Sequence, residues 1–506
     1  MGAVDPDPPA PIRALVMGAV DPDPPAPVCD REGIDMTDEE VERRVKAMPS
    51  PRLAPLNYAV PVRRHKHTSE REREGEREVD ADVDGEGEVY YSASEREGEC
   101  LEGLESIGMG DVLDTSPVVS ARLSNRQVVI GEKVLTDYAS HDYLGMSMHP
   151  VVLKKARAAL RRYGVGSCGP RSFYGTMDAH LLLEQSLAKW TGAEQCIAYS
   201  FGQSAMGSVV PCFARPGDIL FVDELCTKEI FSACTLSRAT VMIFRHNDME
   251  SLEALMHRVS VSPKDRKDQR RFVIVEGLYK ATGNVCPIHK VIPLAESHFC
   301  RVILDESHSL GVLGHTGRGV LEHWRDRDVS TYTISDVDLV TAGLEAAVGG
   351  MGGVCLGDTA LVEHQRLNGI AYCFSASCPP YLAVAATSSV GVLTEDTSLV
   401  LSLGAKCRSC HTLLADMQCV NRGDLSGLGL GVTLLTQFSG SPIQVLSLPS
   451  LEACLSVQSD MRDKGYLLGV DRERANLRMC VGIGVGERDR QRMVAELDAV
   501  IAETLA

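Results

Sequence analysis

The sequence contains no lysine between Lys290 and Lys406, so this long stretch offers no side-chain amine that could form a Schiff base. No window approaches the roughly 18 apolar residues that a membrane-spanning helix requires, and there is no secretory signal. Basic residues are outnumbered: 51 Lys and Arg stand against 69 Asp and Glu, which gives a formal net charge of −18 at pH 7. Because nucleic-acid phosphates are bound by clustered Lys and Arg, this balance argues against a nucleic-acid-binding surface.

The 17 cysteines are scattered along the chain, which favours free thiols in a reducing compartment over a disulfide framework. One segment, Cys407 to His411, matches the C-x-x-C-H signature of covalent haem attachment. It lies within a stretch with helical apolar spacing, from Leu401 to Met417, and we interpret it as part of an ordinary helix. We therefore expect neither haem nor a metal site.

The first hundred or so residues differ in composition from the rest. Residues 1–11, rich in proline, recur unchanged as residues 17–27, and residues 69–99 are dominated by Glu, Arg and Gly. Neither composition supports a packed core. We therefore predict a disordered, low-complexity region over residues 1–115, interrupted by a charged segment of helical character from Thr37 to Met48.

From Val118 onward, short apolar runs alternate with segments of helical periodicity. This alternation predicts an α/β fold with a mainly parallel sheet covered by helices. We assign residues 116–390, including an N-terminal arm, to this large domain and residues 391–506 to a smaller α+β domain that ends in a helix from Glu487 to Thr504. The predicted strands are Gln127–Ile130, Cys196–Ser200, Ile219–Val222, Thr240–Arg245, Arg271–Glu276, Val302–Asp305, Leu339–Ala342 and Gly353–Leu356, and the predicted helices include Pro150–Tyr163 and Ala179–Trp190.

The end of one predicted strand carries a candidate site. Asp305 ends the apolar run from Arg301 to Leu304, and α/β sheets place their ligands at the carboxyl ends of the strands. His308 follows three residues later. Another predicted strand, from Asp338 to Leu344, runs into the glycine-rich turn Gly349 to Gly353, so both segments should meet at the same edge of the sheet.

Many short motifs fall in a fixed order along the chain. They are Tyr163 to Arg171 (YGVGSCGPR), Phe173 to Thr176, His180 and Glu184, Phe244 to Asp248, Val275 to Tyr279, Gly311 to Gly314, Gly317 to Val320, His364 to Leu367, and Tyr372 to Ser377 ahead of Pro379 and Pro380. In these motifs the chain resembles the α-oxoamine synthase family of pyridoxal phosphate (PLP) enzymes. Within that family it is similar to the long-chain base subunit 1 branch of serine palmitoyltransferase, over roughly residues 116 to 506.

The resemblance implies a fold-type I PLP-dependent transferase, in which active sites form at a dimer interface. Catalytic members of the family hold PLP on a lysine ahead of a glycine pair, and alignment on Gly352 and Gly353 puts Ala346 at that position. The preceding Glu345 is similar to the residue that subunit 1 carries there. The family histidine that stacks on the cofactor ring aligns with Thr227, so two diagnostic cofactor contacts are missing.

Other cofactor contacts are kept. Asp305, which would pair with the ring nitrogen of PLP, and His308 are both present, and this departs from the subunit 1 pattern. Gly202 and Gln203 stand where a strand turns into a helix, and free N–H groups at such a helix start suit a phosphate. The alternative for these two residues is an ordinary strand-to-helix turn. Residual, non-covalent PLP binding therefore stays open.

Four further positions carry over from the family. Arg478 aligns with the arginine that holds the amino-acid carboxylate, and its alternative is a structural ion pair. Cys168 lies in the glycine-rich segment that approaches the active site across the dimer interface, and its alternative is a small buried side chain. Ser375 and Ser377 are assigned to the same substrate and interface region.

The resemblance implies a subunit, non-catalytic by itself, of a heterodimeric serine palmitoyltransferase. A lysine-bearing partner would hold PLP, and the pair would condense L-serine with palmitoyl-CoA to 3-ketodihydrosphingosine, the first step of sphingolipid biosynthesis. The resemblance also implies association with the cytosolic face of the endoplasmic reticulum membrane. Since the sequence has no membrane-spanning segment, we expect either docking through the partner or an N-terminus that has been wrongly assigned.

Two other functions stay open. The chain could be a stand-alone pseudoenzyme or regulatory scaffold that keeps the fold and some affinity for PLP. It could also be an active homodimeric α-oxoamine synthase that takes its lysine from elsewhere, and Lys280 and Lys290 are the nearest in sequence.

Overall fold

The computed structural model describes residues 118–259, 269–421 and 431–505. The predictions for the proline-rich repeat, for the Glu- and Arg-rich stretch and for the segment Thr37 to Met48 lie outside these ranges. Within them, no helix is both long and apolar enough to cross a membrane.

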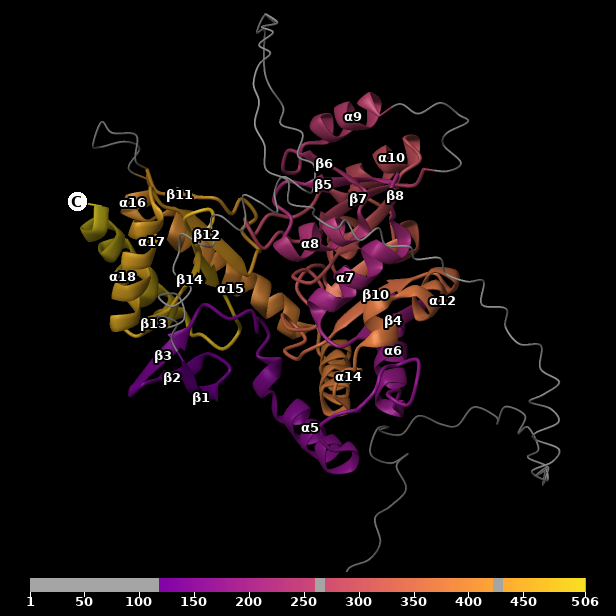
Figure 1. Cartoon of the computed structure of the whole chain (residues 1–506). Helices are drawn as coiled ribbons and strands as arrows, with labels where there is room; N and C mark the ends of the chain where they lie inside the picture. The colour runs from indigo at the N-terminus through magenta and orange to yellow at the C-terminus, as the bar shows by residue number, and fades with distance from the viewer. Residues whose placement is uncertain (1–117, 260–268, 422–430, 506) are drawn as a thin grey trace, which may run out of the picture. The chain divides into compact units, whose positions relative to one another are not determined.

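Seven strands form a central sheet (Figure 1). Five neighbouring strands pair in parallel, whereas β10 runs antiparallel to both of its neighbours. The strands β5 and β7 are buried along their whole length, as expected for apolar strands of a parallel sheet that is covered on both faces. The α/β prediction is confirmed. The order is β4 (Gln195–Tyr199), β10 (Gly353–Gly357), β9 (Leu339–Gly343), β8 (Arg301–Asp305), β7 (Arg271–Glu276), β5 (Ile219–Asp223) and β6 (Thr240–Phe244).

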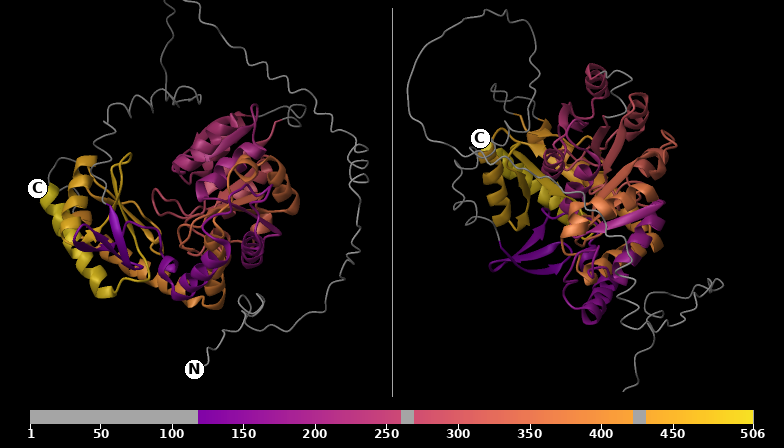
Figure 2. Two further views of the ribbon diagram at one scale, coloured as in Figure 1. Left: turned by 60° about the horizontal axis from the view of Figure 1, so that its bottom comes forward. Right: turned by 45° about the vertical axis from the view of Figure 1, so that its right-hand side comes forward.

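Helices pack against this sheet from the connections between its strands (Figure 2). The helix α7 contacts β9 and β10, α10 contacts β8, and α12 contacts β4. Their bounds are α6 (Asp178–Thr191), α7 (Gly202–Phe213), α8 (Lys228–Ser237), α9 (Met249–Arg258), α10 (Ile288–Ser297), α11 (Val320–Arg325), α12 (Thr359–Asn368) and α13 (Ile370–Phe374), with the short 3₁₀ turns Met146–Met148 and Ile334–Asp336.

The C-terminal region contains a second, antiparallel sheet with helices packed on it, which agrees with the predicted α+β domain. Its strand order is β11, β12, β15, β14, and α17 contacts both β14 and β15. The bounds are β11 (Thr433–Leu434), β12 (Ile443–Ser447), β14 (Gly469–Asp471), β15 (Asn476–Cys480), α16 (Gln418–Asn421), α17 (Leu451–Asp463) and α18 (Glu487–Leu505).

The N-terminal arm forms a third sheet together with a strand from the C-terminal region. The antiparallel strands β1 (Val119–Ser124), β2 (Gln127–Ile130) and β3 (Lys133–Asp137) are extended by β13 (Tyr466–Leu467), which pairs in parallel with β3. The arm that we assigned to the large domain therefore shares its sheet with residues beyond 391.

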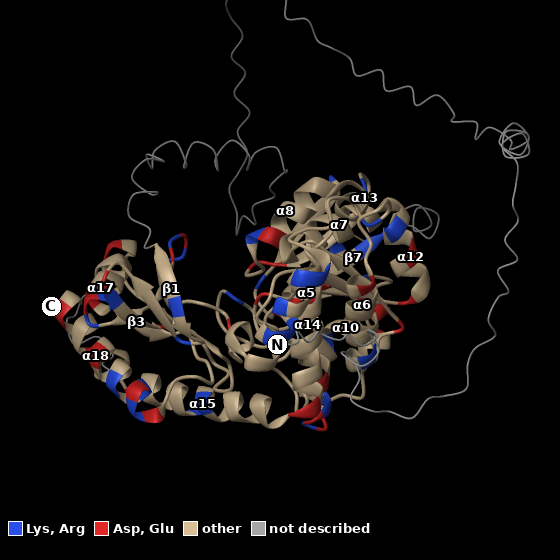
Figure 3. Cartoon of the chain, turned by 90° about the horizontal axis from the view of Figure 1, so that it is seen from below, with Lys and Arg blue, Asp and Glu red and all other residues tan. Residues whose placement is uncertain are grey.

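Two long helices lead from the large sheet to the C-terminal region. The helix α14 (Pro380–Glu395) packs against α5 (Pro150–Tyr163) and α6. The next helix, α15 (Ser398–Ala415), contacts α18 of the C-terminal region (Figure 3). Cys407 and Cys410 are fully buried on α15, and His411 Nδ1 lies 3.0 Å from Gln444 Oε1. Both thiols of the C-x-x-C-H pattern are thus packed within the core.

Candidate functional site

Three carboxylates stand at one edge of the central sheet. Asp223, Glu276 and Asp305 end the adjacent parallel strands β5, β7 and β8. Glu276 and Asp305 are direct partners in the register of β7 and β8. The carboxyl edge of the sheet, where the sequence placed the candidate site, therefore brings together acidic side chains from three strands.

Asp305 is held in one orientation by its neighbours. Its Oδ1 accepts a hydrogen bond from the Ser307 backbone N–H at 2.9 Å, and its Oδ2 accepts one from the Thr341 hydroxyl at 2.9 Å. Burial raises the pKa of this carboxyl, and the hydrogen bonds from Ser307 and Thr341 oppose that rise. Asp305 is half-buried as a residue, and these two hydrogen bonds orient its carboxylate.

His308 belongs to a cluster of side chains that the sequence did not predict. Its Nδ1 lies 3.1 Å from the Tyr143 hydroxyl, and that hydroxyl lies 2.9 Å from His141 Nδ1. The rings of His141 and His308 are 4.8 Å apart between centroids, and Cys480 Sγ lies 3.5 Å from His141 Nδ1. No local signal marks His141, Tyr143 or Cys480, because they come from the N-terminal arm and the C-terminal sheet.

Two cations influence this cluster. Burial, followed by the positive charges of Lys280 and Arg478, lowers the pKa of His308 to about 3, so its ring is neutral near pH 7. Both cations also help to lower the pKa of His141. The Nε atom of Arg478 is buried and has no hydrogen-bond partner within the described ranges. Lys290, the other lysine considered above, is exposed on α10.

Thr227, at the position of the family's stacking histidine, precedes α8 and has a different role. Its backbone N–H donates to Glu276 Oε1 at 2.5 Å, and the Lys280 N–H donates to Oε2 at 3.2 Å. Glu276 is almost completely buried, and this burial, with the nearby Asp305 charge, raises its pKa to about 8. Thr227 thus helps to hold a buried acid through its backbone.

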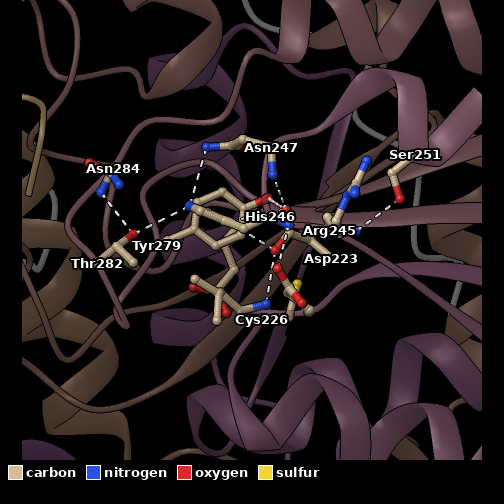
Figure 4. A network of polar contacts seen from close by, with 12 residues as sticks. Asp223, Cys226, Arg245, His246, Asn247, Ser251, Tyr279, Thr282 and Asn284 are labelled. Atoms are coloured by element: carbon tan, nitrogen blue, oxygen red, sulfur yellow. Dashed lines mark hydrogen bonds and ion pairs between the residues drawn. The ribbon is translucent and has the colours of Figure 1, made fainter. Parts of the chain in front are cut away.

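A network around Asp223 ties the loops of this edge together (Figure 4). His246 Nδ1 lies 3.0 Å from Asp223 Oδ1, while the Asn247 N–H and the Tyr279 hydroxyl donate to Oδ2 at 2.8 and 3.1 Å. The rings of His246 and Tyr279 meet edge-on at 4.4 Å. In the sequence, His246 and Asn247 were noted only as part of a motif. The aspartate at the end of β5 was the signal that could have indicated their positioning role.

The predicted phosphate position is at the start of α7. There the Gly202 N–H donates to Glu345 Oε1 at 2.9 Å, so a carboxylate of the chain already uses this amide. Gln203 follows as an exposed residue. The neighbouring Ala346 is buried at 4% exposure. The turn between β9 and β10 is closed by the Leu344 N–H, which donates to the Gly352 carbonyl at 2.9 Å.

The predicted interface residues lie in two segments that are bonded to each other. The Ser377 N–H donates to the Gly169 carbonyl at 2.9 Å, and its hydroxyl donates to the Gly175 carbonyl at 2.6 Å. Ser375 uses its hydroxyl for the Ala371 carbonyl at 2.5 Å. Cys168 is exposed, which rules out the alternative of a small buried side chain in the isolated chain, and has a positive φ of 59°.

One group of possible metal ligands lies elsewhere. Glu253 and His257 of α9 and His298, after α10, bring ligand atoms within 4.8 Å of one another, and the group is exposed or half-exposed. It includes none of the residues described above.

Comparisons with known proteins agree with this architecture. A family model described as aminotransferase class I and II matches residues 133–421. Long chain base biosynthesis protein 1b of Oryza sativa subsp. japonica is 40% identical over 303 residues, which are 60% of this chain and 62% of that protein. Serine palmitoyltransferase 1 of Dictyostelium discoideum is 35% identical over 339 residues, 67% of each chain. The match thus spans about three fifths of the plant relative's length.

Among solved structures, one similar to this chain is a serine palmitoyltransferase from S. paucimobilis with a lysine-to-alanine substitution and a bound PLP–myriocin aldimine. It has a TM-score of 0.71 and 25% identity, and the match covers 80% of this chain and 98% of that one. Another solved serine palmitoyltransferase, with a PLP internal aldimine, has a TM-score of 0.70 with the same coverage. PLP is thus the cofactor of these relatives.

The residues of this chain fit such a cofactor only in part. Thr341 orients the Asp305 carboxylate and Tyr143 contacts His308, and both residues stay predicted partners of the ring. Ala346 has no amine, however, and the amide that should receive the phosphate is bonded to Glu345. The site as it stands does not fit a bound PLP.

Proposed function

This chain belongs to the class I and II aminotransferase family, and we propose that it is the supporting, non-catalytic subunit of a heterodimeric serine palmitoyltransferase. The observation that carries the proposal is that a buried Ala346 stands at the sequence position of the cofactor-holding lysine, in a chain that keeps an oriented Asp305 and a neutral His308. The chain keeps the fold, and the side chain that would hold the cofactor covalently is replaced. These features suit a subunit that completes its partner's active site rather than one that catalyses the reaction by itself.

The reaction proposed for the pair is the condensation of L-serine with palmitoyl-CoA to 3-ketodihydrosphingosine, with release of CO2 and CoA. PLP, held by a lysine of the partner, would act as the electron sink for loss of the serine carboxylate. The relatives named serine palmitoyltransferase 1 and long chain base biosynthesis protein 1 support this choice of reaction.

The surface supports a partner subunit. Tyr174 is 98% exposed and Phe173 69%, and both lie in the segment that hydrogen bonds join to residues 375–377. Phe374, on α13, is 80% exposed, and Ile370 and Leu367 are exposed as well. Large apolar side chains gathered on two linked segments are typical of a subunit interface. We place the partner on this surface, which we call the aromatic surface.

Two residues of this chain would complete the shared pocket. Cys168 is exposed in the segment Gly164 to Gly175, next to the aromatic surface, and would approach the partner's site there. Arg478 is half-buried, its Nε has no hydrogen-bond partner within the described ranges, and we assign its guanidinium to a carboxylate such as that of serine. Location at the endoplasmic reticulum membrane would follow from the partner.

The test is to isolate the chain gently from its native cells in detergent and to identify stoichiometric partners by mass spectrometry. A homologue with a lysine ahead of its glycine pair is expected. The partner alone, equally folded, should then condense serine and palmitoyl-CoA much more slowly than the pair. A partner that works at full rate without this chain would overturn the proposal.

A second candidate, a regulatory scaffold without a part in synthesis, is favoured by one observation. Asp305 and His308 remain assembled although the covalent residue is missing, as in a chain that retained its fold for binding. The same isolation separates the two functions, because a scaffold would be recovered without a lysine-bearing homologue. If the chain were instead an active homodimer that used Lys280 to hold PLP, borohydride reduction in the presence of PLP would leave Lys280 covalently modified.

A further inference from the structure

The first amide of α7 is occupied by an anion that belongs to the chain itself. Glu345 Oε1 accepts the Gly202 N–H at 2.9 Å, although the two residues lie far apart in sequence. The first N–H groups of a helix have no partner within the helix, and the helix dipole favours a negative charge there. Glu345 therefore meets the requirement that a phosphate would otherwise meet.

Two glycines lie directly against the carboxylate of Glu345, which is an exposed residue. A Cβ atom on Gly202 would lie 2.9 Å from both carboxylate oxygens of Glu345, and a Cβ on Gly343 would also collide with that group. A side chain at position 202 or 343 would therefore displace the carboxylate, and we call this position, formed by Gly202 and Gly343, the glycine seat. It lies between the end of β9 and the start of α7.

The local charges disfavour a second anion. Burial raises the pKa of Glu345, and the hydrogen bond from the Gly202 N–H opposes that rise. The Asp305 charge raises this pKa further, and the Lys280 charge lowers it. A phosphate brought to the same amide would compete with Glu345 for one N–H and would add its charges to two carboxylates. Because like charges repel, such a ligand is disfavoured while Glu345 occupies the amide.

We infer that Glu345 is a built-in substitute for the cofactor phosphate, and that this carboxylate, in addition to the missing lysine, prevents the chain from binding PLP or free phosphate. Removal of the carboxylate opens the anion position at the start of α7. The inference concerns this chain's own site and does not depend on the proposed partner or reaction.

The test uses the purified full chain and its Glu345→Ala variant. Pyridoxal phosphate and inorganic phosphate are titrated separately, with binding followed by equilibrium dialysis and by the melting temperature. The wild-type chain is expected to show no saturable binding of either anion. The Glu345→Ala variant should melt at a lower temperature without ligand, should recover stability as phosphate is added, and should bind PLP at least tenfold more tightly than the wild type.

Glu194→Ala is the matched control. Glu194 likewise accepts a backbone N–H at a helix start, that of Thr359 at 3.2 Å, but at α12 and without the glycine seat. Its loss should lower the melting temperature without creating phosphate or PLP binding. Glu345→Gln, which keeps the shape of the side chain, provides a second variant if Glu345→Ala does not fold, and it should show a weaker gain of the same kind.

Two results would overturn the inference. One is saturable binding of PLP by the wild-type chain with the affinity of Glu345→Ala. The other is that both variants, Glu345→Ala and Glu345→Gln, fold but bind neither PLP nor phosphate. Both results concern binding to the single chain, so they are distinguishable from failure of the proposed function, which is measured on the pair.

Discussion

Asp305 and Thr341 face each other in register on the adjacent strands β8 and β9, and the Thr341 hydroxyl donates to Asp305 Oδ2 at 2.9 Å. The carboxylate is therefore fixed by the sheet itself. No ligand is needed to orient it.

Thr341→Val should weaken this arrangement. The variant keeps the shape of the buried side chain but removes the donor, so we expect a loss of about 0.5–1.5 kcal/mol in the free energy of unfolding. Urea denaturation measures it. Thr240→Val, at the exposed start of β6, is the control and should change stability by less than about 0.5 kcal/mol. Equal losses in both variants would show that the hydrogen bond contributes nothing specific.

Glu276 should make stability depend on pH. Burial raises its pKa in the folded chain to about 8, above the ordinary value of 4.5, so the folded state binds more protons than the unfolded state between these values. The resulting stabilisation is present below about pH 4.5 and is lost as pH rises towards 8. Glu276→Gln should therefore reduce the fall in stability between pH 5.5 and 8, by at most about 1.4 kcal/mol per pH unit.

Urea titrations of both proteins across this pH range check the prediction, with Glu253→Gln on α9 as an exposed control. A slope that Glu276→Gln leaves untouched would assign the pH dependence to other buried acids, such as Glu306, whose pKa burial raises to about 7.

Tyr174→Ala should weaken assembly without unfolding the chain. Tyr174 is 98% exposed in the single chain and would be buried by a partner on the aromatic surface. Loss of such an aromatic side chain from an interface typically costs more than about 1.4 kcal/mol, or tenfold in affinity. Co-purification and sedimentation with the partner measure this. Phe299→Ala, which removes another exposed aromatic side chain just after α10, is expected to leave affinity unchanged.

Ala346→Lys should not restore catalysis by itself. The variant regains an amine at the right place in sequence, but Thr227 still lacks a ring for stacking and Glu345 still occupies the Gly202 amide. Product formation by the purified variant, without a partner, is the measurement. Condensation of serine and palmitoyl-CoA by this single mutant would show that the lysine was the one missing element.

Most of the fold could be predicted from local sequence. Strands such as β7 and β8 are continuous apolar runs, and they lie within a residue of their predicted bounds because a buried parallel strand has no polar face. The place of Asp305 followed from the same pattern, since the end of a strand is visible where the apolar run stops.

The contacts that decide what the site can hold were not predictable in this way. Glu345 and Gly202 lie on different elements, and neither residue type at its position signals the other. The cluster of His141, Tyr143 and His308 likewise joins the N-terminal arm to the turn that follows β8. Periodicity identifies elements, but side-chain contacts between distant elements depend on the packing of the whole chain.

The pairing of β3 with β13 has a consequence for how the protein is made. Thr136 lies opposite Tyr466 in that parallel pair, so the edge of β3 stays open until almost the whole polypeptide has left the ribosome. Contacts of such long sequence separation form slowly, because a large loop must close first. The arm is thus the first described segment to be synthesised and among the last to complete its native strand pairing.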